Sequence, residues 1–499
     1  MIRSRLADEI GRIDKQAPHR IALAYPSPYA VGMSSLGYQS IYRIIQAMPG
    51  VMCERVFLPD GADRAGTTEI EVPVSYESLR PLGDFPIIAF SVAYELEIAG
   101  MIRMLDEARV PLLVEDRREG DPIVIAGGPL TFSNPVPMMP FADVVIQGEA
   151  EEVTPWAIEV IHQASTRDAA LDNLAAHPHI NVPIKNGYEP RNPAACDLAL
   201  LPAISAIRTP HTELSNMFLI EAERGCSREC KYCVMRRTTN GGMRLVSAET
   251  ILSSIPEDVM KVGLVGAAVS DHPKITHIVN ELADRGLGVG LSSLRPDRLK
   301  EPFIEALCRG GYRTLTTALD GTSERMRQMV VRRGYEKHYV NAAELARKYK
   351  MKRLKLYLMV GLPEEDDSDI DECVEFVSGL SKIVPIALGV APFCAKRKTP
   401  LDGYAYAGVD VVSKRLDRLR KGLKGRADVR STSAKWAWVE YVLAQGGARE
   451  GRAMIEAVQA GGRFADYRKA FAPLGYSVHG AQQAGGSASP RKLPLLSGS

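Results

Sequence analysis

Residues 217–233, MFLIEAERGCSRECKYC, place an apolar, strand-like run directly before a group of closely spaced cysteines: Cys226, Cys230 and Cys233. Thiolates are soft ligands that select zinc, copper(I) or iron–sulfur clusters. Structural zinc needs a fourth ligand, and the nearest histidines, His211 and His272, lack zinc-finger spacing. A cubane cluster normally takes four cysteines, so three leave one iron open to another ligand. The stretch therefore predicts a [4Fe-4S] cluster with an open iron.

Around this stretch, strand-like runs alternate with helical ones. The strand candidates are 217–222, 262–269, 287–293, 313–319, 354–360 and 386–391. Six βα-like units of this kind predict a partial (βα)6 barrel, shorter than the complete eight-unit form. Barrel active sites form at the C-terminal ends of the strands, and the cysteines directly follow the first strand. We therefore expect chemistry at this end of the barrel.

The first 150 residues show a similar alternation. Their apolar runs are 21–26, 51–57, 85–92, 122–129 and 142–149. Near-continuous apolar strands between helices indicate a parallel sheet covered on both faces. We predict a doubly wound, Rossmann-like domain in 1–150, a connector in 151–215, the partial barrel in 216–402, a small helical C-terminal region in 403–476 and a disordered tail in 477–499.

Composition limits the function further. The 499 residues hold 62 Lys and Arg against 60 Asp and Glu, a net charge of +2 that gives no reason to expect a nucleic-acid or membrane binder. The basic stretch 414–426 contains Asp417 and is flanked by Asp410 and Asp428, and it is interpreted as a solvated helix face. The chain shows no apolar run long enough to span a membrane, and its charged first fifteen residues lead us to expect no secretory signal. Five of its eight cysteines are scattered, so we expect reduced thiols and a cytoplasmic location.

The cysteine spacing, with Tyr232 before the last cysteine, resembles the signature of the radical S-adenosylmethionine (radical SAM) superfamily. This resemblance implies that the open iron binds SAM, and that an electron from an external donor such as flavodoxin or ferredoxin cleaves SAM. The resulting 5′-deoxyadenosyl radical would remove hydrogen from an unactivated carbon of an unknown substrate. The resemblance also implies SAM contacts at Tyr232 and at the ends of the second to fifth strands: Gly266, Ser292, Arg295, Asp320, Val360 and Gly361.

A Rossmann-like domain before such a barrel resembles the cobalamin-dependent class. The residues that carry this likeness follow the third, fourth and last strands: Ser91, Gly127, Gly128, Gly148 and Glu149. The small residues among them would let a corrin nucleotide tail approach the backbone. The class's best-known motif places a histidine after the first strand. Here His19, the only histidine before residue 150, precedes that strand, so we expect no histidine ligand to cobalt.

The whole chain resembles an uncharacterised family of fused cobalamin-binding and radical SAM proteins, through Tyr94-Glu95-Leu96 and Phe393-x2-Lys396-x3-Pro400 among other motifs. The implied reaction is methylation of an unactivated carbon in the cleft between the sheet edge and the barrel mouth. Three alternatives stay open: cyclisation or rearrangement, a Rossmann domain that holds substrate without cobalamin, and a non-enzymatic iron–sulfur sensor. A methylthiotransferase is rejected because its second cluster needs three further cysteines, and only Cys53 and Cys196 precede the triplet.

Overall fold

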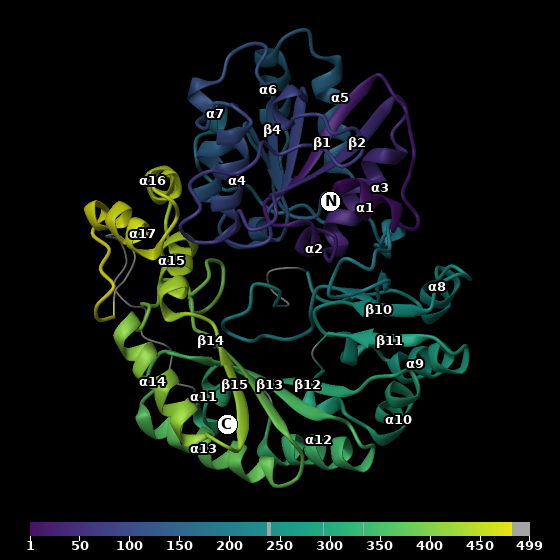
Figure 1. Cartoon of the computed structure of the whole chain (residues 1–499), viewed down its shortest axis with the longest axis vertical. Helices are drawn as coiled ribbons and strands as arrows, with labels where there is room; N and C mark the ends of the chain where they lie inside the picture. The colour runs from purple at the N-terminus through teal and green to yellow at the C-terminus, as the bar shows by residue number, and fades with distance from the viewer. Residues whose placement is uncertain (237–240, 293, 333, 482–499) are drawn as a thin grey trace.

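The computed structural model describes residues 1–481 except 237–240, 293 and 333. The predicted tail therefore lies outside the described residues from 482 onward. Two α/β units stand one above the other, and helices from the C-terminal region connect them along one side (Figure 1). Within the described part of the chain, no helix combines the length and apolar character needed to cross a membrane.

The N-terminal unit is a doubly wound sheet with strand order β2-β1-β3-β4-β5-β6. Its strands are β1 (His19–Tyr25), β2 (Val51–Phe57), β3 (Ile87–Ser91), β4 (Ile123–Gly127), β5 (Val144–Ile146) and β6 (Ile180–Asn181). The first five are parallel, and β6 is antiparallel to β5. The order reverses between β1 and β3, and ligands of such sheets bind outside the C-terminal strand ends at this point.

Helices cover both faces of this sheet (Figure 1). They are α1 (Ile2–Ala7), α2 (Tyr29–Gly32), α3 (Leu36–Ala47), α4 (Glu97–Glu107), α5 (Val153–Gln163), α6 (Arg167–Ala175) and α7 (Pro183–Asn186). Ile158 of α5, Leu171 of α6 and Ile180 of β6 share one buried core with Leu23 of β1. The N-terminal unit thus continues well beyond residue 150, into the segment that the sequence indicated as a connector.

The second unit is a partial barrel of parallel strands. These are β7 (Phe218–Glu221), β10 (Lys261–Val265), β11 (Gly288–Leu291), β12 (Thr314–Asp320), β13 (Arg353–Val360), β14 (Ile386–Pro392) and β15 (Ala427–Ser431). A bridge between Leu294 and Thr317 joins the sheet β11-β10-β7 to the sheet β12-β13-β14-β15. All six predicted strands are present. The seventh, β15, lies beyond residue 402 and pairs in parallel with β14.

The barrel helices lie on the convex side of this arc (Figure 1). They are α8 (Ala248–Ser253), α9 (Ile275–Asp284), α10 (Glu301–Arg309), α11 (Glu324–Met329), α12 (Glu336–Lys348), α13 (Asp367–Ser381) and α14 (Val409–Gly422). The predicted fold class, a doubly wound sheet followed by a partial barrel and C-terminal helices, is confirmed.

The C-terminal helices α15 (Ala434–Gln445), α16 (Ala448–Gln459) and α17 (Phe464–Phe471) hold the two units together. The Asn134 side-chain amide, from the N-terminal unit, donates to the carbonyl of Leu443 at 3.0 Å. A Cβ added at Gly451 would lie 2.0 Å from the Pro137 carbonyl oxygen, so this glycine lets α16 lie directly on the N-terminal unit. Trp438 of α15 packs in the core of this region, where its ring is buried against Phe464 and Phe471.

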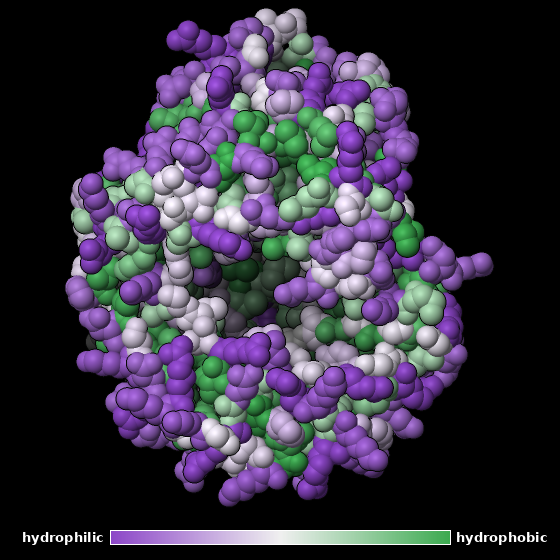
Figure 2. Space-filling model, viewed as in Figure 1, coloured by the Kyte–Doolittle hydropathy of each residue, from purple (hydrophilic) through white to green (hydrophobic). Residues whose placement is uncertain are grey.

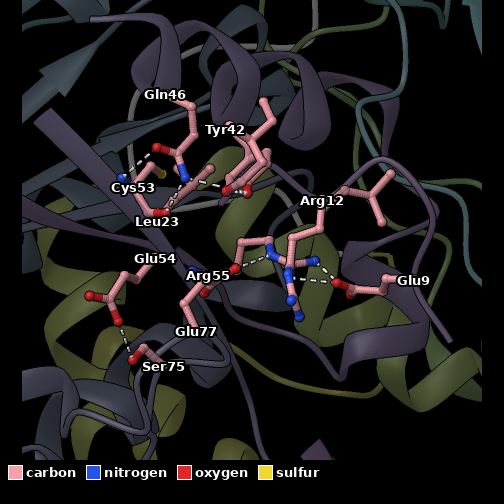
Figure 3. Close-up of polar contacts among 12 residues, drawn as sticks. Glu9, Arg12, Leu23, Tyr42, Gln46, Cys53, Glu54, Arg55, Ser75 and Glu77 are labelled. Atoms are coloured by element: carbon pink, nitrogen blue, oxygen red, sulfur yellow. Dashed lines mark hydrogen bonds and ion pairs between the residues drawn. The ribbon is translucent and has the colours of Figure 1, made fainter. Parts of the chain in front are cut away.

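A buried ion cluster fixes the N-terminal segment to the edge strand β2. The Arg55 guanidinium donates to both carboxylate oxygens of Glu9, at 2.7 and 2.8 Å, and to Glu77 at 2.6 Å (Figure 3). Its side chain is only 1% exposed. Burial raises the pKa of Glu77 although Arg55 opposes the shift. Two acidic segments distant in sequence therefore depend on one buried cation.

Replacing Arg55 by Ala should lower the free energy of unfolding by about 3–5 kcal/mol, because the change leaves buried carboxylates without their cation. Chemical denaturation followed by circular dichroism measures the loss. The matched control is Arg430→Ala, since the Arg430 side chain is 80% exposed and pairs with Asp428 at the surface. This control should change stability by less than about 0.5 kcal/mol. Equal losses in both variants would contradict the assignment.

Candidate active site between the two sheets

The three predicted cluster ligands lie at the C-terminal end of the first barrel strand. After β7 the chain forms β8 (Glu223–Arg224), which pairs with β9 (Arg244–Leu245) and closes the cysteine loop. Cys226 and Cys230 are buried, at 9% and 7% exposure, and Cys233 is partly exposed. All three thiols are free. The loop thus presents its sulfur ligands at the barrel end predicted from the sequence.

The donor set of this loop suits a cluster better than a single ion. A single structural zinc ion needs four ligands, whereas this loop offers three thiols. A cubane cluster instead takes each thiolate on a separate iron. Burial raises the pKa of Cys226 and that of Cys233, the latter to about 11, so binding iron would displace protons from these thiols.

A cavity of about 400 Å³ separates the C-terminal edge of the N-terminal sheet from the barrel mouth. On the face shown in Figure 2, the surface is deeply hollowed between the two units and apolar side chains lie inside the hollow. From the barrel, the cavity is lined by Glu223, Gly225, Gly266 and Ala267. From the sheet it is lined by the whole set predicted for cobalamin: Ser91, Gly127, Gly128, Gly148 and Glu149. The predicted cobalamin set and one predicted SAM contact, Gly266, therefore line the same cavity.

The same cavity continues into the N-terminal unit as a slot between the sheet and α3. Its walls there are apolar, with Leu23, Ile125 and Ile146 on the strands and Leu36 and Ile41 on the helix. Apolar, largely pre-formed cavities of this size are typical of cofactor sites.

The three glycines at this edge differ in whether the backbone around them leaves room for a side chain. A Cβ at Gly127 would meet the Ile146 carbonyl oxygen at an ordinary 3.5 Å. Gly128 has a φ of +105° and would place a Cβ 2.7 Å from the Val92 carbonyl oxygen. Gly148, at φ +95°, would place one 2.3 Å from the backbone nitrogen of Ala194. The backbone itself requires glycine at 128 and 148, so Gly127 is the position that can accept a side chain.

Glu149 connects the N-terminal sheet to the cysteine loop. Its carboxylate forms ion pairs with Arg244 and, at 3.3 Å, with Arg224, and it accepts from the backbone amide of Cys196 at 2.8 Å. Burial opposes its ionisation, but the bonds from Arg244 and Cys196 outweigh burial and lower its pKa. Glu149, predicted to contact cobalamin, is thus ion-paired with Arg224 before the cysteine loop and with Arg244 after it.

A second buried ion pair joins the units at the opposite rim. The ammonium nitrogen of Lys396, after β14, lies 2.7 Å from a carboxylate oxygen of Glu95 and 2.7 Å from one of Glu440. Glu95 follows β3 and Glu440 belongs to α15. Two motifs noted in the sequence, around Glu95 and Lys396, therefore meet in space.

Three of the remaining predicted SAM contacts, Arg295, Asp320 and Tyr232, interact with neighbouring side chains. Arg295 is paired with Asp271 and Asp297. Asp320 has a φ of +64° at the end of β12 and lies 2.8 Å from Arg332. Burial, then Asp320, raises the pKa of Tyr232 well above its usual value. A second cavity, of about 240 Å³, lies beside Cys230. Three arginines line it: Arg228, Arg295 and Arg332.

Ser292 is exposed at the end of β11. The amide of Gly361 donates to Glu365 at 2.6 Å, and the carbonyl of Val360 accepts from the amide of Phe393 at 2.8 Å. The backbone groups of these two predicted SAM contacts therefore already take part in hydrogen bonds within the rim.

Glu223 is a site residue that the sequence reasoning missed. Its side chain is 1% exposed, and one oxygen accepts from the backbone amide of Ala268 at 2.6 Å. The other oxygen is buried and lacks a hydrogen-bond partner among the residues that the structure describes. Burial, together with the carboxylates of Glu221 and Asp271, raises the pKa of Glu223 to about 7. The sequence feature that could have identified Glu223 is its position, because it is an acidic residue directly after the first barrel strand.

Comparison with known proteins agrees with this architecture. The family model described as "Radical SAM proteins, N-terminal" matches residues 37–183, and the one described as "Radical SAM superfamily" matches residues 220–377. The chain is 26% identical over 413 residues to the uncharacterized protein MJ0966 of Methanocaldococcus jannaschii, covering 81% of this chain and 83% of that protein.

Among solved structures, the cobalamin-dependent S-adenosylmethionine radical enzyme OxsB with aqua-cobalamin and S-adenosylmethionine bound superposes with a TM-score of 0.51 at 12% identity. The same enzyme with aqua-cobalamin alone gives 0.50 at 13% identity. Each match covers 82% of this chain and 58% of the other, so the chain spans little more than half of that enzyme. At this identity the likeness shows a shared fold.

Proposed function

Because this chain belongs to the radical SAM superfamily, we propose that, within the radical SAM reaction, it uses cobalamin to methylate an unactivated carbon. One observation carries this proposal. The cavity between the units is bordered by the strand ends of a sheet with the order 2-1-3-4-5 and by the loop of three free thiols. Two cofactors on these two walls would meet one substrate carbon.

Cys226, Cys230 and Cys233 would hold the [4Fe-4S] cluster. When bound, the cluster and SAM supply a 5′-deoxyadenosyl radical. The chain positions them through the β8–β9 pair and the Glu149 ion pairs, which fix both ends of the loop. The apolar walls of the cavity suit reacting groups that must be kept from water. A cytoplasmic location and an external electron donor, such as flavodoxin or ferredoxin, belong to the same proposal.

The slot beside Gly127 supports cobalamin as the second cofactor. Its apolar walls and the open space at Gly127 fit the entry of a corrinoid nucleotide tail. When bound, cobalamin supplies the methyl group. None of the described residues that line the cavity is a histidine. His19 instead stacks on His162 at 4.3 Å, at the N-terminal end of β1. The chain therefore offers cobalt no imidazole from this cavity.

Changing any one of the three loop cysteines to Ala should remove the cluster and abolish formation of 5′-deoxyadenosine, because each thiolate is expected to hold one iron. Iron and sulfide analysis after anaerobic reconstitution, with chromatography of the nucleoside product, measures both effects. Cys308→Ala is the control, since Cys308 lies on the outer helix α10 and is partly exposed. Persistent SAM cleavage by Cys230→Ala would contradict the assignment.

A leucine at Gly127 should extend into the slot and weaken corrinoid binding by about tenfold or more, because it would occupy space that the nucleotide tail needs. Equilibrium dialysis with aqua-cobalamin measures the affinity. Gly379→Leu makes the same change in open space on α13 and should bind as the wild type does. Spectroscopy of the bound corrinoid should show no protein nitrogen on cobalt. Wild-type affinity in Gly127→Leu, or a histidine ligand, would refute the proposed binding mode.

Methyl transfer itself is tested with methyl-labelled SAM, a reductant and a cell extract as the substrate source. Label should enter a product, and each methyl group transferred should accompany one 5′-deoxyadenosine and one S-adenosylhomocysteine. The Cys230→Ala protein should transfer none. If 5′-deoxyadenosine forms with corrinoid bound and label never transfers, cyclisation or rearrangement replaces methylation as the reaction.

A further inference from the structure

The loop after β14, residues 393–402, connects the N-terminal unit to the cysteine loop. The ammonium of Lys396 lies 2.7 Å from a carboxylate oxygen of Glu95, in the N-terminal unit. Five residues further on, the amide of Leu401 donates to the carbonyl of Lys231, between the second and third loop cysteines, at 3.3 Å. The loop therefore crosses the mouth of the barrel, the end at which barrel enzymes bind their substrates.

Hydrogen bonds hold the middle of this loop in one conformation. The Thr399 hydroxyl donates to the Lys396 carbonyl at 2.8 Å, and the Arg397 guanidinium donates to two carbonyls at the C-terminal end of α15, at 2.7 and 2.9 Å. Lys398, between these residues, has a φ of +63°, in the left-handed region that residues other than glycine rarely adopt. Such a conformation persists only where the surrounding contacts fix it, and it is common at ligand sites.

The fold does not use the side chain of Lys398. Within the described part of the chain, its ammonium has neither a hydrogen bond nor a carboxylate partner. Burial alone lowers its pKa, yet the residue is exposed to solvent. A lysine that is both accessible to water and surrounded by protein lies in a concave part of the surface. The hollow between the two units is such a surface (Figure 2).

The position of Lys398 brings its ammonium near the cysteine loop. It lies three positions before Leu401, so the two Cα atoms are at most about 11 Å apart. The lysine side chain adds a flexible four-carbon stem that ends in three donors. The described residues that line the cavities of about 400 and 240 Å³ do not include Lys398. Both cofactor walls therefore leave this cation for a third molecule.

We propose that Lys398 binds an anionic group of the substrate, a carboxylate or a phosphate, an inference that rests on the proposed function. An ammonium without a partner gains a charge-assisted hydrogen bond from such a group. A bound anion also favours the charged form of a lysine whose pKa burial lowers. The substrate class is therefore an organic acid or a phosphate ester.

A first test uses two probe anions and needs no identified substrate. Lysines of the anaerobically reconstituted protein are labelled with acetic anhydride and quantified by peptide mass spectrometry, at an ionic strength held constant with sodium chloride. Excess inorganic phosphate or succinate should slow the labelling of Lys398, because a bound anion covers its ammonium. Lys414, exposed on the outer helix α14, should label at the same rate throughout. Protection by either anion supports the inference and shows which acid class fits, whereas protection by neither overturns it.

A second test assigns the anion to the substrate, through methyl transfer from labelled SAM with a cell extract. Lys398→Met keeps the side-chain length and removes the charge, so it should lower transfer at limiting extract about tenfold or more, as expected for loss of a charge-assisted bond. Lys414→Met is the matched control and should transfer label as the wild type does. Equilibrium dialysis should give the same affinities for SAM and for aqua-cobalamin in Lys398→Met and wild type. Weaker binding of either cofactor assigns the anion to that cofactor and overturns the inference.

Wild-type transfer by Lys398→Met overturns the inference and leaves the proposed function intact. If the wild type cleaves no SAM, the proposed function fails, and the labelling experiment still decides whether Lys398 binds anions. Circular dichroism and iron content verify that each variant is folded and loaded. If Lys398→Met does not fold, labelling of the wild type decides the matter in the same way.

Discussion

The ion pairs of Glu149 with Arg224 and Arg244 are the interaction on which the rest of the site depends. They join the loop after the last parallel strand of the N-terminal sheet to the two short strands that close the cysteine loop. All three side chains are largely buried, so separating them would leave uncompensated charge in a poorly solvated place. These ion pairs therefore keep the C-terminal edges of the two parallel sheets facing each other. Lys396, between Glu95 and Glu440, has the same effect on the opposite rim.

Two facing sheet edges explain why a single cavity can hold two cofactor sites. Strand ends in doubly wound sheets and in barrels are both places where ligands bind. Here the loops after β4 and β5 form one wall, and those after β7 and β10 form the other. Glycines make the close packing possible, each in its own way. Gly128 and Gly148 adopt backbone conformations that side chains disfavour, Gly266 makes room for Glu223, and Gly127 leaves space in the slot.

The buried carboxylates of this protein differ in whether their oxygens have partners. Glu149 is paired with arginines, and Glu97 accepts from a hydroxyl and an amide. Glu365 is bonded to Gly361, Thr322 and Arg415. Glu223 differs, because one of its oxygens lacks a partner among the described residues while it faces the cavity. A fully bonded buried carboxyl stabilises the fold, whereas a half-bonded one beside a cavity is suited to bind a ligand.

The cysteine spacing and the alternation of apolar runs with helices were enough to predict both α/β units, because these are local patterns that strand and helix geometry impose. The strand β15 was missed since its five residues, Ala427–Ser431, include two charged ones, and only pairing with β14 makes them a strand. Ion pairing is equally non-local: Lys396 and Glu95 lie 301 positions apart. The sequence by itself therefore determined which chemistry the loop can support. Only the tertiary structure decided which carboxylates hold the domains together and which one remains available for a ligand, because that depends on neighbours brought close by folding.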